Sequence, residues 1–273
     1  MNIYRPVYFT LKGELIVEDN DTVDKQLFQR CMFVKFLNRR SEKKIMYDSK
    51  LKMHFESDSL SSSVYEVETD NFYVTASGRL SKAADFIRRL NYRYDWIQIR
   101  VNNSGRITAV ENIPELKMRW ERLKKRVQKD YYGNVVTGHL RKLDKEFVTD
   151  NNILKSVCQY LFFGLLFPEI PLTHSDNWKN ERKVEFSEYE GEDFIEQMHY
   201  AGKDKGMNHY RITGQTLESS RLELIKYDGY LWRKDEHISS WQVYMKIQYK
   251  RGKAVRTWTF RLDQYSNDHY GIY

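Results

Sequence analysis

The sequence is poor in the residues that break regular structure or cross-link chains. Its 273 residues include only 13 glycines, 4 prolines and 2 cysteines. So little glycine and proline excludes a flexible linker and a low-complexity segment. The two cysteines, Cys31 and Cys158, lie within apolar stretches. We interpret both as reduced and buried, which fits a cytosolic chain.

No stretch of the sequence is apolar for long enough to cross a bilayer. The apolar run at residues 160–167 has eight residues, whereas a transmembrane helix needs about 20. Residues 1–6 lack the basic and apolar regions of a secretory signal and lead directly into a strand-like pattern. We therefore expect a cytoplasmic protein without a membrane span.

The sequence also lacks the short motifs of common enzyme classes. It has no Gly-x-Gly-x-x-Gly, Walker loop, Gly-x-Ser-x-Gly, His-Glu-x-x-His or Cys-x-x-Cys. The histidines have no metal-ligand spacing, and we interpret His199 and His209, on either side of a turn, as ordinary strand residues. We predict no catalytic residues, no metal and no cofactor.

Carboxylates are the remaining acid/base candidates. Strand alternation places Glu188, Glu190 and Glu192 on one face, and a solvated edge strand explains them better than a catalytic pair does. An enzyme whose site is assembled from distant residues is therefore the third hypothesis, after a binding or scaffold protein and a protein that binds single-stranded nucleic acid.

The composition is that of a folded, aromatic-rich and mildly basic protein. Hydrophobic residues make up 41% of the chain and aromatic residues 15%, which argues against disorder. There are 45 Lys and Arg against 38 Asp and Glu, so the net charge is +7. Both signs are mixed along the chain, whereas dedicated nucleic-acid binders concentrate their positive charge further.

Helical signals follow one another at residues 112–168. Asn112 is placed to cap a helix over residues 113–131, in which Pro114 suits the first turn and Glu115 completes a capping-box spacing. The apolar positions of this helix recur at steps of three and four, at Leu116, Trp120, Leu123 and Val127.

Two further helices follow in this central group. One is predicted over residues 139–148, with Gly133 ending the helix before it. The next begins at residue 149 or 150 and continues into the apolar run before Pro168. We interpret that run as a buried helix end, with an exposed apolar lip as the alternative.

The segments on both sides of the helices have strand patterns. Residues 3–18 are predicted to form a hairpin that turns at Lys12–Gly13, and Asp228–Gly229 and Arg251–Gly252 are predicted hairpin turns nearer the C-terminus. The other predicted strands are at residues 27–37, 50–56, 64–75, 94–101, 106–110, 183–189, 194–200, 208–216, 222–227, 230–234, 241–250 and 254–263, and a short helix is predicted from Ser81.

These elements predict an α+β fold. A long, curved, meander-like antiparallel sheet would carry about three helices on its concave face, because packing the helices there buries the apolar sides of both sheet and helices. We expect one continuous unit, with β-rich residues 1–111, helical residues 112–168 and β-rich residues 172–273. The alternative is two domains divided near residues 169–181.

The first functional hypothesis is a non-catalytic binding or scaffold protein. Abundant aromatic side chains and the lack of a catalytic motif favour contact with another protein, or with an apolar ligand, through a groove between sheet and helices. The oligomeric state is left open. The candidate contact residues are Trp232, Trp241, Tyr244, Trp258, Phe162 and Phe163.

The alternative is a protein that binds single-stranded nucleic acid. Aromatic residues interleaved with cations on a sheet are typical of surfaces that stack bases and follow phosphates, although the same pattern arises when aromatics fill a core and cations face water. The candidate residues are Arg119, Arg122, Lys125 and Arg126 on the first central helix and Lys250, Arg251, Lys253 and Arg256 near the C-terminus.

Overall fold

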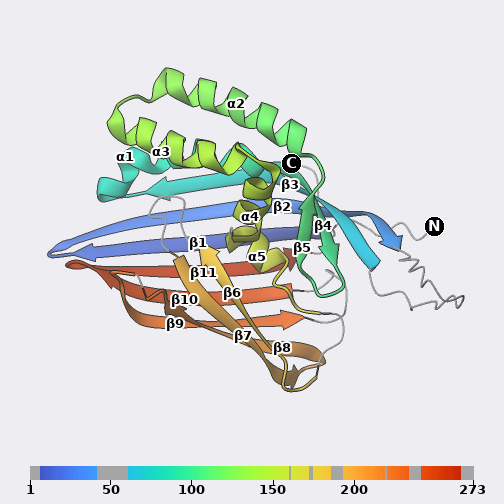
Figure 1. Ribbon diagram of the computed structural model, residues 1–273. Coiled ribbons are helices and arrows are strands. Elements are labelled where there is room, and N and C mark those ends of the chain that lie inside the picture. Colours follow the sequence, from blue (N-terminus) through green and yellow to red (C-terminus); the bar gives the residue numbers. More distant parts are fainter. Residues whose placement is uncertain are drawn as a thin grey trace, which may run out of the picture.

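A computed structural model of the protein describes residues 7–41, 61–159, 161–171, 175–185, 193–218, 220–233 and 241–265. In these residues an antiparallel sheet of eleven strands curves around a group of helices (Figure 1). The predicted α+β architecture, with helices on the concave face of a long antiparallel sheet, is confirmed. The predicted strand at residues 50–56 and the carboxylates Glu188, Glu190 and Glu192 lie outside the described residues.

The sheet consists of two meanders joined through the first and last strands. Its strand order is β5-β4-β3-β2-β1-β11-β10-β9-β8-β7-β6, so every neighbouring pair except β1–β11 is consecutive in sequence. The strands are β1 (Val7–Asp19), β2 (Thr22–Ser41), β3 (Ser61–Ala76), β4 (Trp96–Asn102), β5 (Ile107–Val110), β6 (Lys179–Glu185), β7 (Asp193–Asp204), β8 (Met207–Thr216), β9 (Glu223–Arg233), β10 (Trp241–Arg251) and β11 (Ala254–Tyr265).

Four of the described helices connect the two meanders, a fifth connects β3 to β4, and the helices lie on one face of the sheet. They are α1 (Ser81–Leu90), α2 (Ile113–Asp130), α3 (Asn134–Asp144), α4 (Asp150–Gln159) and α5 (Leu161–Leu166), with short 3₁₀ turns at Gly78–Leu80, Asn91–Tyr94 and Lys145–Phe147. Helix α2 begins at Ile113 as predicted, with Pro114 in its first turn, and buries Leu116, Trp120 and Val127. Helix α4 contacts both β5 and β6, the two edge strands of the curved sheet.

The core lies between the concave face and the helices. Buried apolar side chains from both meanders and from the helices form one contiguous cluster. The apolar run before Pro168 belongs to this cluster, because Phe163, Leu165, Leu166 and Phe167 are buried. Its interpretation as a buried helix end is therefore confirmed for these residues.

Two glycine signals predicted turns that the structure does not contain. The hairpin at Lys12–Gly13 is wrong, since β1 continues through both residues and turns at Asn20–Asp21, where Asn20 has a φ of 53°. Gly13 instead makes room for the Phe28 ring of β2, which would lie 1.9 Å from a Cβ at this position. A glycine inside a strand here marks close packing rather than a chain reversal.

The predicted hairpin at Asp228–Gly229 is wrong for the same reason. Both residues lie in the middle of β9, where a Cβ on Gly229 would come within 2.8 Å of the Tyr244 carbonyl oxygen and of Met245. The predicted turn at Arg251–Gly252 is confirmed, with Gly252 at a φ of 61°. Two helix limits also differ, since α3 begins at Asn134, directly after Gly133, and ends before the 3₁₀ turn that carries Phe147.

A buried ion pair fastens the last strands of the sheet to α5. Arg182 of β6 donates from Nε to Glu196 Oε1 of β7 over 2.7 Å and from Nη1 to the Gly164 carbonyl over 2.9 Å. The hydroxyl of Tyr227 in β9 donates to Glu196 Oε2 over 3.0 Å. Burial and the nearby Glu196 carboxylate raise the pKa of Tyr227 well above its usual value.

We expect Glu196→Ala to lower the free energy of unfolding by about 3–5 kcal/mol, because it leaves the Arg182 guanidinium buried without its carboxylate. Tyr227→Phe removes one hydrogen bond and keeps the ring, so its cost is about 1 kcal/mol. Urea titrations of the two variants measure both values. Equal losses for the two variants would contradict a buried ion pair.

We also expect the whole chain to unfold in a single cooperative transition. One sheet and one apolar cluster contain residues of both β-rich halves, so neither half can lose its packing alone. Scanning calorimetry is the measurement, and the van't Hoff and calorimetric enthalpies should agree. Two separate heat-absorption peaks would support the alternative of two domains.

Candidate functional site

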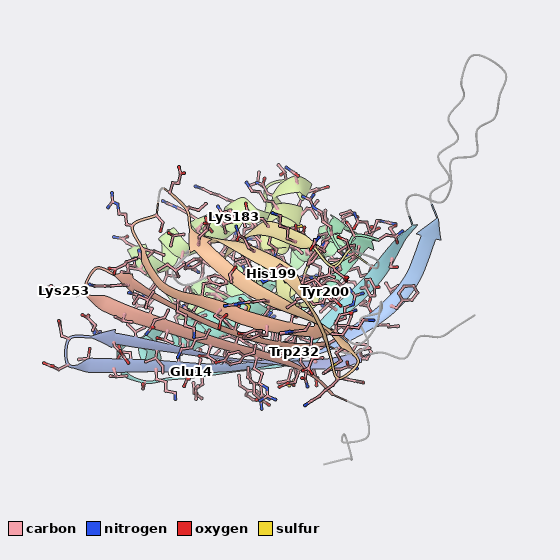
Figure 2. All side chains as sticks on the ribbon, turned by 90° about the horizontal axis from the view of Figure 1, so that it is seen from below. Glu14, Lys183, His199, Tyr200, Trp232 and Lys253 are labelled. Atoms are coloured by element: carbon pink, nitrogen blue, oxygen red, sulfur yellow. The ribbon has the colours of Figure 1, made fainter. Side chains whose placement is uncertain are left out.

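The face of the sheet opposite the helices is the candidate contact surface. Along β9, the buried residues Tyr227, Leu231 and Arg233 alternate with Tyr230 and Trp232, which are only half-buried. Figure 2 views the molecule from this side, with the strands in front of the helices and Trp232 on the near face. We call this side the outer face. None of the described helices covers it.

Four aromatic side chains gather on the outer face, and we call them the aromatic patch: His209 of β8, Tyr230 and Trp232 of β9, and Tyr244 of β10. The register places His209 opposite Trp232 and Tyr230 opposite Tyr244. The His209 ring stacks on Trp232 and on Tyr230, with centroid distances of 5.2 Å and 5.4 Å. Tyr244 is 40% exposed at the side of this stack.

A shallow groove continues from the aromatic patch across the outer face. Tyr244 lies opposite Arg261 of β11, which lies opposite Lys12 of β1. The groove has a volume of about 440 Å³ and is lined by Lys12, Glu14, Leu27, Gln29, Tyr73 and Arg261, among others. Tyr73 is 59% exposed at its far end. One row of side chains therefore connects the aromatic patch with the groove.

Charges around the aromatic patch are mixed and largely paired. Arg261 Nε lies 2.7 Å from the Asp263 carboxylate, and Arg211 Nε lies 3.7 Å from that of Asp228. Lys25 forms an ion pair with Glu14 beside the groove. These three cations therefore each have a carboxylate close by, and Lys12 is a further cation in the lining of the groove.

The structure separates the six residues predicted to contact a partner. It brings Trp232 and Tyr244 together on the outer face. Trp258 lies on the inner face, where it stacks on Phe260 at 5.5 Å and its Nε1 donates to the Tyr249 hydroxyl over 3.4 Å. Phe163 is fully buried in the core. The side chains of Trp241 and Phe162 lie outside the described set.

The eight cations of the nucleic-acid hypothesis fall into two separate groups. Arg119 lies 2.5 Å from the Asp95 carboxylate and over the Trp96 ring, whereas Arg122, Lys125 and Arg126 are exposed on α2. The second group is at the β10–β11 hairpin, where Lys250, Arg251 and Lys253 are exposed and Arg256 is half-buried. Neither group adjoins the aromatic patch in the sheet register.

Sequence reasoning missed three residues of this surface: His209, Tyr230 and Tyr73. Alternation along β9 was a sufficient signal for Tyr230, because it lies two residues before Trp232. His209 and Tyr73 join the surface only through strand register, which depends on long-range pairing.

The described part of the chain shows no cluster of side chains suited to a metal ion. His199 and His209 both lie on the outer face, but His199 pairs with Arg211 and His209 with Gly202. Burial raises the pKa of the Cys158 thiol to about 11, so its thiolate is scarce at neutral pH. None of the helices in the described ranges has both the length and the apolar character needed to cross a bilayer.

Comparisons with known proteins place the chain in no family. No protein-family model matches it, and neither does a curated protein. Among solved structures, one that describes lipid–protein interactions in lipovitellin is similar over 96% of this chain, with a TM-score of 0.36 and 10% sequence identity. The chain spans 25% of that lipovitellin chain. A similarity at this level carries no argument about function.

We expect two tryptophan variants to report which face each side chain occupies. Trp258→Ala should lower the free energy of unfolding by about 3–5 kcal/mol, since it leaves a cavity in the core. Trp232→Ala should cost about 1 kcal/mol, because the ring loses stacking contacts but is partly solvated already. Urea denaturation measures both, and a larger loss for Trp232 would contradict the assignment of faces.

Proposed function

We propose that the protein is a non-catalytic binding protein that contacts another protein through the outer face of its sheet. The observation that carries this proposal is the stack of His209, Tyr230 and Trp232 on a face that no described helix covers. Tyrosine and tryptophan rings that are already held in place bury a large area on binding and lose little conformational entropy.

The surroundings of the aromatic patch favour a protein partner over a nucleic acid. Paired charges of both signs are typical of the rim of a protein interface. A site for single-stranded nucleic acid needs cations in excess, since its phosphates supply much of the binding free energy. At the aromatic patch, however, Arg211 and Arg261 each have an aspartate beside them.

The packing of the concave side also favours the outer face over a groove between sheet and helices. Leu15, Ile97 and Ile247, on three separate strands of the concave face, have no exposed surface. A ligand at these positions would have to displace side chains that already pack at the density of a protein interior. The outer groove beside Lys12 and Tyr73 needs no such rearrangement.

The test is affinity capture from native lysate that has been cleared of membranes and treated with nuclease. The double variant Trp232→Ser/Tyr244→Ser should bind the captured partner about 30-fold more weakly, which corresponds to the loss of one hot spot of about 2 kcal/mol. Titration of the partner onto immobilised protein measures the change.

Tyr132→Ser is the matched control, because Tyr132 is 90% exposed in the loop between α2 and α3 and lies far from the outer face. It should capture the same partner as the unmodified protein. Equal capture by the double variant would contradict the proposal. A partner captured only from a parallel lysate without nuclease would favour the nucleic-acid alternative instead.

A further inference from the structure

The hairpin of α2 and α3 carries a strong excess of positive charge. Residues 122–142 contain seven of the 45 Lys and Arg residues but only one of the 38 Asp and Glu residues, a net charge of +6. The rest of the chain holds 38 cations against 37 carboxylates. The segment comprises the second half of α2, the connecting loop and most of α3. One of its seven cations, Lys124, is paired with Glu121 and Asp144, which lie just outside the segment.

The loop between α2 and α3 is held in place by its first residue. Tyr131 donates a hydrogen bond from its hydroxyl to the Asp85 carboxylate of α1, and its ring packs against Phe86 at 5.3 Å. Gly133 then reverses the chain at a φ of 106°, a conformation that favours glycine. The loop lies at one end of the helix layer (Figure 1).

Two apolar side chains project from this anchored loop. Tyr132 is 90% exposed and Val135, in the first turn of α3, is 86% exposed. The neighbouring tyrosine and valine are less exposed, since Tyr131 and Val136 are half-buried against the core. Solvation of a valine side chain is unfavourable, so this exposure is a cost that contact with an apolar phase would remove.

Exposed cations lie on both helices of the hairpin that carries the two apolar side chains. Lys125, Arg126 and Lys129 are exposed on α2, opposite the stripe of Leu116, Trp120 and Val127 that packs on the core. Arg141 and Lys142 are exposed on α3. The single carboxylate of the segment, Asp130, forms an ion pair with Arg89 of α1 and so does not offset these charges. We call Lys125, Arg126, Lys129, Tyr132, Val135 and Arg141 the basic tip.

We infer that the basic tip docks on an anionic lipid surface. Tyr132 and Val135 enter the boundary between headgroups and acyl chains, where a tyrosine ring and an aliphatic side chain are both favoured. The surrounding Lys and Arg side chains approach the headgroup phosphates and carboxylates. Each cation held near such a surface strengthens association by about fivefold. A nucleic acid also attracts the cations, but it offers no apolar phase for Val135.

The test is co-sedimentation of the full chain with vesicles of phosphatidylcholine alone or with phosphatidylserine at about three to one. We expect binding to the anionic vesicles and at least about tenfold weaker binding to the neutral ones. High salt should release the protein, because the Debye length falls from about 10 Å at 0.1 M to about 3 Å at 1 M.

Two sets of variants separate the charged and apolar contributions. Lys125→Gln/Arg126→Gln/Lys129→Gln should weaken binding to the anionic vesicles by roughly a hundredfold. Tyr132→Ser/Val135→Ser should weaken it by about tenfold through lost apolar contact. The altered side chains are exposed, so circular dichroism should show an unchanged fold. Val148→Ser is the matched control, because Val148 is 68% exposed just before α4 and belongs to neither the basic tip nor the aromatic patch, and it should bind as the unmodified protein does.

Equal sedimentation with neutral and anionic vesicles, or none with either, would overturn the inference. The same vesicles are compared with a single-stranded oligonucleotide. Oligonucleotide binding that needs the three cations, together with vesicle binding that is indifferent to Tyr132 and Val135, would assign the basic tip to nucleic acid and would also overturn it.

Discussion

Pairing between the first and last strands is the constraint on which the rest of the structure depends. β1 and β11 are antiparallel neighbours over eleven residue pairs, from Tyr8–Tyr265 to Glu18–Val255. Every other strand pairs with its sequence neighbour, so this contact alone brings distant parts of the chain into one sheet. Without it, the two meanders would each present a long unpaired edge, which invites association with other chains. Closing so large a loop costs entropy, which many native contacts must offset together.

The curvature of the joined sheet gives its two faces different roles. The concave side closes on the helices, and α4 lies near both β5 and β6, the strands at the two ends of the sheet. Arg182 strengthens this closure, since it links β6 to Glu196 of β7 and to the Gly164 carbonyl in α5. The apolar side chains of the concave face pack in the core, whereas His209, Tyr230, Trp232 and Tyr244 lie on the outer face, which none of the described helices covers. The row from Tyr230 to Tyr73 exists only because β11 and β1 connect the meanders.

Local physical chemistry made much of this fold predictable from the sequence. The spacing of apolar residues located α2 to within one residue. The predicted side-chain cap is wrong, because Asn112 Oδ1 accepts a hydrogen bond from the Gln98 backbone N–H and caps no N–H of the helix. The failures at Gly13 and Gly229 share a cause. Each glycine accommodates a neighbouring strand, Phe28 in one case and Met245 in the other, and a local pattern cannot distinguish this from a turn. The sequence predicted Trp232 and Tyr244 of the aromatic patch but not His209. His209 lies beside Trp232 only because of the pairing between β8 and β9, which the local sequence does not reveal.

The outer face of the sheet and the α2–α3 hairpin differ in how their charges are distributed, a difference that the overall composition does not reveal. A net charge of +7 over 273 residues indicates no particular partner. In the folded chain, Arg211 and Arg261 on the outer face are each beside an aspartate, which leaves the aromatic rings as the distinctive feature there. At the α2–α3 hairpin the cations outnumber the carboxylates, and Asp130 is itself engaged by Arg89. An aromatic surface with paired charges and a basic surface with exposed apolar side chains attract different partners. The two proposed contacts, one with a protein and one with a lipid surface, therefore use different parts of the molecule.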